Sequence, residues 1–402
     1  MTTDAPQAPA AARATAVRLL RLAAFTSTFD RFSAPPLLVV IAADLGVSLA
    51  GVARVATLYY LGYGVGQAFW GAASDRLGRV RTMRLTLAGS GLLGLAAALA
   101  PGLKALLVAR GLQGALFGAI IPSAIVYVGD TFRMVERQRP LSSIIGASAQ
   151  ATAVSTLVAG AAADVLSWRV AFAVPAAMAL VLAVVLRRLP EPARGAPEPV
   201  RAQLARVLRS GWVRLVLCLG LVEGATMLGA ITFLAPALQS RGASATAAGA
   251  VVAIYGLGLF GGSRLLAFLA DRVPVTRLMA LGGALLALGV AVPAITLSVA
   301  PVAGGVLVAG IGFGLLHTNL QAWATDLVPQ ARATAVSLFV TALFAGSALG
   351  TALLTPLADA GRFSPLFAVY AAALVPLAVA AVTGRARYDA ARARTRAAPG
   401  QR

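Results

Sequence analysis

Cysteine, histidine and lysine are almost missing from this chain of 402 residues, which has one of each: Cys218, His317 and Lys104. A single cysteine excludes an internal disulfide, and one cysteine with one histidine offers no metal-binding cluster. The chain also lacks H-E-x-x-H, G-x-S-x-G and a glycine-rich loop followed by Lys-Ser or Lys-Thr. The sequence therefore predicts no catalytic residues, no metal site and no cofactor, and direct drive by ATP is not expected.

Charge is scarce as well, since only 12% of the residues are charged while 59% are hydrophobic. Little of the chain is left for a water-soluble domain. A segment that crosses a bilayer needs about 20 mostly apolar residues, and it must satisfy its own backbone hydrogen bonds, which here favours helices. We predict an all-α integral membrane protein with twelve transmembrane helices, at residues 16–43, 49–73, 82–100, 103–129, 140–164, 167–187, 212–238, 243–270, 276–298, 301–326, 332–357 and 364–384.

The charges that are present are mostly arginines, and the formal net charge is +20. Arginine clusters precede the first span and follow spans two and four. Further clusters lie around the middle of the chain and in its last residues. The alternate loops carry only Lys104, Arg169, Arg241 and Arg362. By the positive-inside rule, this pattern predicts a multi-pass protein of the cell (inner or plasma) membrane with both termini cytoplasmic. The basic excess would contact anionic lipid headgroups, and it is weak evidence for a nucleic-acid partner.

A proline-rich break divides the chain into two halves. Pro190, Pro192, Pro197 and Pro199 lie among charged residues and predict a linker on the cytoplasmic face. The predicted units are a disordered cytoplasmic tail at 1–15, a six-helix bundle at 16–187, the linker at 188–211, a second six-helix bundle at 212–384 and a basic cytoplasmic tail at 385–402.

The two halves align with each other at a nearly constant spacing. Asp75 falls on Asp271 and Gly114 on Gly310 at an offset of 196 residues, and Asp164 falls on Asp359 at an offset of 195. A register kept over several spans predicts two bundles that are pseudo-repeats of each other, as in transporters whose halves are related by an axis along the membrane normal.

A charged hairpin connects the second and third predicted spans. It has the form G-x-x-x-D-R-x-G-R-x-R, with Gly71, Asp75, Arg76, Gly78, Arg79 and Arg81. This run resembles the signature loop of the major facilitator superfamily of secondary transporters. The resemblance implies a cytoplasmic gating loop that latches the outward-open state, whereas a solvated basic turn is the alternative. The second-half copy keeps Asp271 and Arg272 but has lost its glycines.

The first span carries Asp30 and Arg31 near its middle, followed by two prolines and the run I-A-A-D-L-G at 41–46. It resembles the first span of the family's proton-coupled drug exporters, and Arg110 opens an R-x-x-Q-G run that implies a role near the proton site. A carboxylate at mid-membrane depth loses hydration, so we expect Asp30 to bind and release a proton. Two alternatives stay open: Asp30 is a structural counter-ion of Arg31, and Arg110 snorkels to the outer surface.

The second half contributes two more proton-coupling candidates, Glu223 in span seven and His317 in span ten. An ionisable group inside a span normally faces the bundle interior or a cavity, although His317 is as readily explained as a hydrogen-bonded packing residue. Residues that lie deep within a predicted span, or that share a helical face with such residues, are candidates for lining the substrate cavity. They are Arg31, Tyr59, Tyr63, Gln67, Gln113, Phe117, Asn319 and Gln321.

The fifth span departs from the exporter pattern. The exporters carry G-P-x-x-G-G before W-R-x-x-F, but here Ser155, Thr156, Ala159 and Gly160 occupy the first element while the second is intact. The resemblance implies a monomeric, proton-coupled antiporter that exports a small amphipathic, drug-like compound and confers drug resistance, with protons, substrate and lipid as partners. Because the G-P-x-x-G-G element is incomplete, two alternatives remain: uptake by symport, and export of a sugar or metabolite. A membrane-embedded enzyme has no supporting motif.

Overall fold

The computed structural model describes residues 10–192, 200–328 and 331–397, and within these ranges every regular element is helical. The predicted all-α fold is confirmed. The elements are α1 (Ala10–Phe32), η1 (Pro35–Leu37), α2 (Leu38–Leu45), α3 (Leu49–Leu77), α4 (Arg79–Ala98), α5 (Leu103–Phe117), α6 (Ile120–Thr131), η2 (Met134–Glu136), α7 (Gln138–Val165), α8 (Trp168–Val185), η3 (Leu186–Arg188), α9 (Val200–Arg209), α10 (Gly211–Glu223), η4 (Gly224–Leu228), α11 (Gly229–Gln239), α12 (Ala245–Leu269), α13 (Val275–Ile295), α14 (Val299–Leu327), α15 (Arg332–Asp359) and α16 (Phe363–Ala397).

Nine helical runs in the described residues are long and apolar enough to cross a membrane. Four of them are composite: α5 with α6, η2 with α7, α8 with η3, and α10 with η4 and α11. The helices α1, α3 and α4 are also of spanning length, but arginine, glycine and tyrosine lower their hydropathy. Nine runs and these three helices are consistent with the twelve predicted spans.

Helical structure extends beyond the predicted spans at both ends of the chain. Residues 10–15 of the predicted disordered tail begin α1, and residues 385–397 of the predicted basic tail continue α16. Both stretches are rich in alanine and arginine, which are strong helix formers. The helix α9 likewise lies within the predicted linker. Residues 1–9, 193–199 and 398–402 of these three segments lie outside the described residues.

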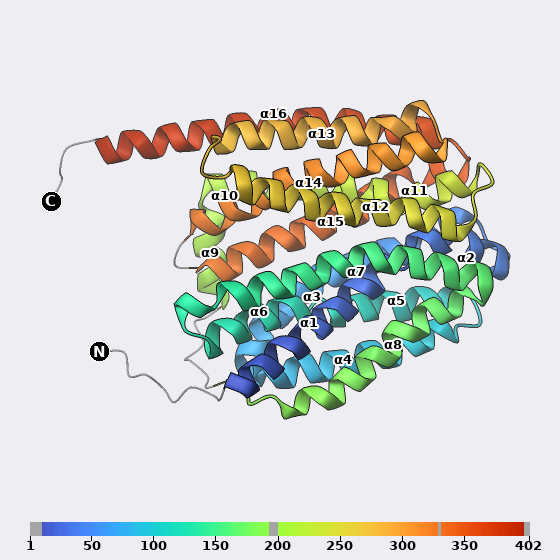
Figure 1. Cartoon of the computed structure of the whole chain (residues 1–402), viewed down its shortest axis with the longest axis horizontal. Coiled ribbons are helices and arrows are strands. Elements are labelled where there is room, and N and C mark those ends of the chain that lie inside the picture. Colours follow the sequence, from blue (N-terminus) through green and yellow to red (C-terminus); the bar gives the residue numbers. More distant parts are fainter. Residues whose placement is uncertain (1–9, 193–199, 329–330, 398–402) are drawn as a thin grey trace.

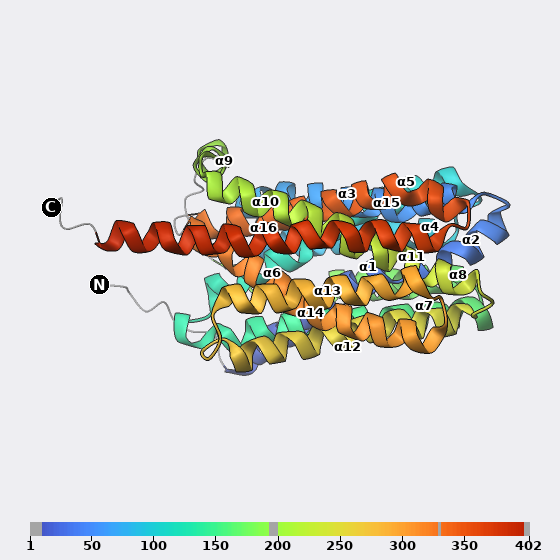
Figure 2. The ribbon, with the colours of Figure 1, turned by 90° about the horizontal axis from the view of Figure 1, so that it is seen from above.

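The helices form two bundles, α1 to α8 and α10 to α16, which occupy the lower and upper halves of Figure 1 and run along the same axis in Figure 2. The bundles meet where α7 runs along α12 and α3 along α15. Glycine allows the close approach: a Cβ on Gly160 would overlap the carbonyl group of Ala245, and one on Gly249 that of Thr156. Small residues let membrane helices pack closely where lipid supplies no hydrophobic drive.

The first span is broken just after its charged pair. Pro35 and Pro36 lack the backbone N–H that helix α1 would need to continue, so α1 ends at Phe32 and the chain resumes in η1 and α2. The Ser33 hydroxyl donates a 2.8 Å hydrogen bond to the Asp30 carbonyl in this last turn. The break therefore places Asp30 and Arg31 in the last turn of α1.

Two aspartates join the bundles at the distal end, by which we mean the end that carries α2 and lies opposite both termini in Figure 1. Asp359, which ends α15, accepts a 2.8 Å hydrogen bond from the backbone N–H of Ala50 in α3. Asp164 of α7 accepts hydrogen bonds from the backbone N–H and hydroxyl of Thr246 in α12, at 2.7 and 2.6 Å. Negative charge stabilises a helix N-terminus, so these repeat mates close the distal end in a pseudo-symmetric way.

We expect Asp164→Ala and Asp359→Ala each to weaken this closure by about 0.5–1 kcal/mol, the cost of losing a side-chain cap at an exposed helix N-terminus. Distances between spin labels at the distal ends of α3 and α12 should shift towards longer values, most in the double variant. The control is Asp389→Ala, because Asp389 pairs with Arg385 inside α16. Unchanged distances in the double variant would show that the two aspartates do not hold this end closed.

Candidate functional site

Asp30 and Arg110 form an ion pair deep inside the first bundle. Nη1 of Arg110 donates to both carboxylate oxygens of Asp30, at 2.8 and 2.9 Å, and Nη2 donates to the Asp30 carbonyl at 3.2 Å. Gln113 donates to Oδ1 of Asp30 at 3.2 Å and accepts from Arg110 at 2.7 Å. All three side chains are fully buried. The carboxylate has the counter-charge and hydrogen bonds that a buried ion pair needs.

Two aromatic rings lie against the Arg110 guanidinium. Its central carbon lies 4.4 Å from the ring centre of Tyr59 and 4.5 Å from that of Phe172. Such contacts stabilise a desolvated cation. Arg110 therefore does not snorkel to the surface, and Asp30 is the counter-ion of Arg110 rather than of Arg31.

We expect Asp30→Ala or Arg110→Ala to lower the free energy of unfolding by about 3–5 kcal/mol, because each leaves an uncompensated buried charge. The double variant should lose less than the sum of the two single variants. Thermal unfolding of the purified protein in detergent would measure these losses. Asp389→Ala breaks an exposed pair and should cost at most about 1 kcal/mol. If the loss in the double variant equals the sum of the losses in the two single variants, the result would argue against the ion pair.

Glu223 and His317 form a second buried pair, in the second bundle. His317 Nδ1 lies 3.0 Å from Glu223 Oε2, and the imidazole stacks on Phe313 with ring centres 4.6 Å apart. Glu223 is fully buried, the His317 side chain is 18% exposed, and Oε1 of Glu223 has no hydrogen-bond partner among the described residues. The π-helical segment η4 follows Glu223 directly, and π-helical turns are frequent at functional sites.

Arg31 points into a cluster of aromatic rings that come from both bundles. Its guanidinium carbon lies 5.0 Å from the ring centre of Phe32, 4.8 Å from that of Tyr63 and 5.1 Å from that of Phe344 in α15. Arg31 is half-buried, and in the part of the chain that the structure describes it forms no ion pair with a carboxylate. Its Nε and the hydroxyl of Tyr63 are buried without hydrogen-bond partners. Phe344 was not predicted, because a single aromatic residue in an apolar span gives no distinguishing signal.

The remaining cavity candidates divide into two groups. Tyr59 and Tyr63 share a face of α3, as predicted, with stacked rings 6.3 Å apart, and Gln67 one turn further on is buried. Phe117 at the end of α5 is also buried, and its carbonyl accepts a 3.2 Å hydrogen bond from Ser27.

In the second bundle, Asn319 donates to the Leu315 carbonyl of its own helix at 2.8 Å, and Gln321 is half-exposed. Neither is hydrogen-bonded to His317 within the described residues. The structure therefore places Tyr59 against Arg110 and Tyr63 against Arg31, and it gives Asn319 and Gln321 no hydrogen bond to the Glu223–His317 pair within the described residues.

The charged hairpin is held within the first bundle. Asp75 pairs with Arg79, which also donates to Asp130 at 3.2 Å. Gly78 has φ +102°, a conformation that favours glycine. Gly71 lies close to α15, since a Cβ there would come within 3.9 Å of the Ser337 hydroxyl. The side chains of Arg76 and Arg81, and those of Asp271 and Arg272 in the second-half copy, are exposed.

Glu191, at the start of the linker, is a partner of the hairpin that the sequence analysis missed. Its carboxylate accepts hydrogen bonds from the backbone N–H groups of Val80 and Arg81, at 3.1 and 3.0 Å. It thus caps the N-terminus of α4. A glutamate between two prolines in a charged linker carries no signal for this contact.

Two motifs that are distant in sequence meet at the distal end. Asp44 of the I-A-A-D-L-G run accepts hydrogen bonds from Arg169 at 2.7 Å and from Trp168 at 2.9 Å. The hydrogen bond from Arg169, and then that from Trp168, hold the pKa of Asp44 below its ordinary value. These two motif segments therefore bind each other within the first bundle.

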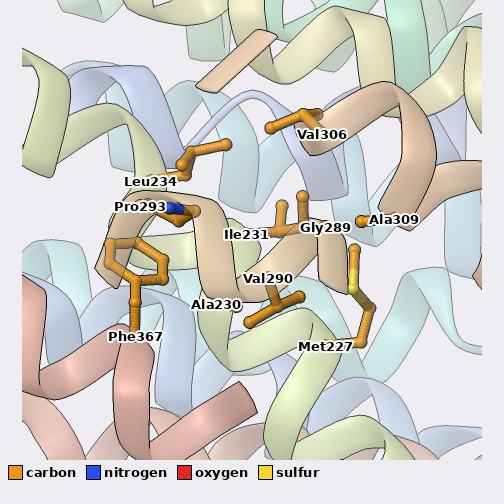
Figure 3. Close-up of a pocket in the computed structure, with 10 residues that line it drawn as sticks. All are labelled: Met227, Ala230, Ile231, Leu234, Gly289, Val290, Pro293, Val306, Ala309 and Phe367. Carbon is orange, nitrogen blue, oxygen red and sulfur yellow. The ribbon is translucent and has the colours of Figure 1, made fainter. Parts of the chain in front are cut away.

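A small apolar pocket lies in the second bundle, lined by Met227, Val306, Ala309 and Phe367 among other residues (Figure 3). None of the predicted site residues lines it. At the repeat offset of 196, Val306 replaces Arg110 and Ala309 replaces Gln113, and at the offset of 195 Phe367 replaces Phe172. The pocket is thus the counterpart of the Asp30–Arg110 site, with small apolar residues where the first bundle has a charge network.

Comparison with protein families identifies a match to the major facilitator superfamily over residues 20–351 and, in an overlapping second match, over 216–401. Among curated proteins, a triacylglyceride transporter of Mycolicibacterium hassiacum is 29% identical over 50% of this chain and 37% of its own length. A puromycin resistance protein of Streptomyces alboniger is 32% identical over 38% of this chain and 30% of its own length. The matches therefore span only about a third of the length of these relatives.

Solved structures show the same fold along nearly the whole chain. A bacterial homologue of the human lysosomal transporter Spinster, in an inward-facing conformation, superposes with a TM-score of 0.76 at 17% identity, covering 94% of this chain and 98% of its own. The nucleoside transporter NupG superposes with a TM-score of 0.77 at 15% identity, covering 92% of this chain and 99% of its own.

Proposed function

The chain belongs to the major facilitator superfamily, and from that premise we propose that it is a proton-coupled antiporter that exports a small amphipathic compound by alternating access. It is a multi-pass membrane transporter and not an enzyme. We further propose that it acts as a monomer in the cell (inner or plasma) membrane with both termini cytoplasmic. The arginine pattern supports this orientation, and the start of α1 and the end of α16 lie opposite the distal end in Figure 1.

The observation that carries the proposal is the incompletely bonded Glu223–His317 pair. A buried carboxylate with one unbonded oxygen, hydrogen-bonded to a partly exposed imidazole, can gain or lose a proton without breaking any other contact. Intramembrane acidic and histidine residues in such settings form proton relays. We therefore assign the transported proton to this pair first.

Asp30 is the second candidate for the proton. Arg110 and Gln113 already occupy its carboxylate oxygens, so protonation of Asp30 would have to break the ion pair. A proton that separates Asp30 from Arg110 would change the packing of α1 against α5, which is one way to couple proton binding to movement.

The distal bonds support an inward-open state within the alternating-access scheme. Asp164 and Asp359 bind the bundles together at the distal end, whereas Asp75 and Arg79 pair with each other inside the first bundle. An inward proton would release roughly 2.3 kcal/mol per 100 mV of membrane potential. That free energy would support more than tenfold accumulation of the compound outside.

Uptake by proton symport is the second candidate function. It is favoured by the loss of the G-P-x-x-G-G element at Ser155 to Gly160, and the structure of a D-xylose–proton symporter superposes with a TM-score of 0.74 at 17% identity, covering 91% of this chain and 96% of its own. Export is favoured by relatives that are named as efflux pumps and as a puromycin resistance protein. Energised transport in inside-out and right-side-out vesicles separates the two directions.

We expect Glu223→Gln to lower the rate of proton-driven transport more than tenfold, because glutamine keeps the shape of the side chain but cannot exchange a proton. Equilibrative exchange of the compound should continue. Expressing cells should be screened against a panel of toxic amphipathic compounds, and a protected compound should then be measured in proteoliposomes with an imposed pH gradient. His317→Gln should shift the pH dependence rather than abolish transport.

Asp30→Asn is the matched comparison, because it neutralises the other buried carboxylate. If Asp30→Asn abolishes coupling and Glu223→Gln does not, the proton belongs to Asp30. If both variants accumulate the compound against its gradient with an unchanged pH profile, transport is not coupled to protons through either residue.

A further inference from the structure

Arg31 and Arg110 are two arginines inside the first bundle whose surroundings differ in kind. Arg110 is fully buried and bonded to a carboxylate, an amide and a carbonyl. Arg31 is half-buried, and its nearest described neighbours are aromatic rings. A cation inside a membrane span normally pairs with an anion or with backbone carbonyls. Within the described residues, then, Arg31 lacks the anion that its position calls for.

The groups beside Arg31 also lack partners. Its Nε and the hydroxyl of Tyr63 are buried and unbonded, and buried polar groups in native proteins are nearly always hydrogen-bonded. These two donors lie close together, since the Arg31 guanidinium lies 4.8 Å from the Tyr63 ring centre. An acceptor with more than one oxygen would satisfy both.

We propose that Arg31 binds the anionic group of the transported compound, a carboxylate, sulfonate or phosphate carried on an apolar body. A guanidinium is planar and matches such groups through two parallel hydrogen bonds. The Tyr63 hydroxyl is the second donor. The inference rests on the proposed function only in that the bound compound is taken to be the one transported.

The surrounding rings define where the apolar body lies. Tyr63 and Phe344 have ring centres 4.6 Å apart, and Tyr60 lies 6.0 Å from Phe344 in a stacked arrangement. These rings come from α3 and α15, one helix of each bundle. A compound held by Arg31 against Phe344 would therefore contact both halves, as a central site must if its occupancy is to influence their relative movement.

The test uses three probes with the same ring system and different charge: 1-naphthoate, 1-naphthamide and 1-naphthylmethylammonium. Isothermal titration of the purified protein in detergent should show naphthoate binding at least tenfold more tightly than the other two. Arg31→Met should abolish that preference. Arg31→Lys should keep the preference for the anion with weaker binding, because lysine retains the charge and loses the planar pair of donors.

Arg264→Met is the matched control. Arg264 is an exposed arginine inside the α12 span whose guanidinium lies 5.1 Å from the Phe260 ring centre, so it carries the same charge and ring contact outside the proposed site. This variant should bind naphthoate like the wild type. Thermal unfolding of all variants checks that they fold. If Arg31→Met does not fold, the comparison of Arg31→Lys with the wild type still tests the inference.

Several results would overturn the inference: equal or tighter binding of the cationic probe, binding of none of the three probes, an anion preference that survives in Arg31→Met, or complete displacement of naphthoate by chloride at equal concentration. The last result would mean a site for small inorganic ions.

Transport of the same probes in proteoliposomes separates this inference from the proposed function. If Arg31-dependent binding of naphthoate is found but a pH gradient does not drive its movement, the inference stands and proton-coupled transport fails. If a pH gradient drives the neutral or cationic probe and not naphthoate, proton coupling stands and the anion site fails.

Discussion

The cost of a charge inside a membrane span is the constraint on which this structure depends. The hydrocarbon offers no water, so a buried charge needs a counter-charge or several hydrogen bonds. Asp30 and Arg110 have a counter-charge and several hydrogen bonds, although Nε of Arg110 is unbonded among the described residues. Glu223 and His317 share one hydrogen bond, and Arg31 is compensated in the described residues only by rings. The degree of compensation ranks the groups: a more complete set of bonds favours a fixed structural role, and a less complete set leaves room for a proton or a ligand.

The two bundles of the pseudo-repeat have different residues at matching positions. The first bundle fills the space between α1, α5 and α8 with Arg110, Gln113 and the ring of Phe172. At the matching positions the second bundle has Val306, Ala309 and Phe367, and an apolar pocket remains. Its own charged pair lies elsewhere, at the junction of α10 with a π-helical turn. A pseudo-symmetric scaffold thus carries two chemically different interiors.

Local sequence patterns were sufficient to predict the fold and part of the candidate site. Apolar runs of spanning length predicted the helices, the repeat offset predicted the two halves, and the spacing of Tyr59 and Tyr63 predicted a shared face that the structure shows. The motif resemblance placed Arg110 near the first span, and the structure pairs it with Asp30.

Contacts between distant segments were not predictable in this way. The helical residues 10–15 lie in the tail for which a high content of alanine, proline and threonine predicts disorder, although alanine and arginine favour helix. Phe344 beside Arg31, Asp44 beside Arg169 and Glu191 on α4 all depend on how helices pack. Each joins residues more than a hundred positions apart, and no periodicity along one segment encodes such a pairing.

The strengths of these interactions also fit a molecule that must open and close. Asp164 and Asp359 join the bundles through exposed hydrogen bonds at helix N-termini, each of which contributes about 0.5–1 kcal/mol. Asp30 and Arg110, by contrast, are shielded from water and lie within one bundle, where breaking the pair costs about 3–5 kcal/mol. Breaking these two distal hydrogen bonds therefore costs less than breaking the Asp30–Arg110 pair, so an opening of the distal end would leave the interior of the first bundle intact.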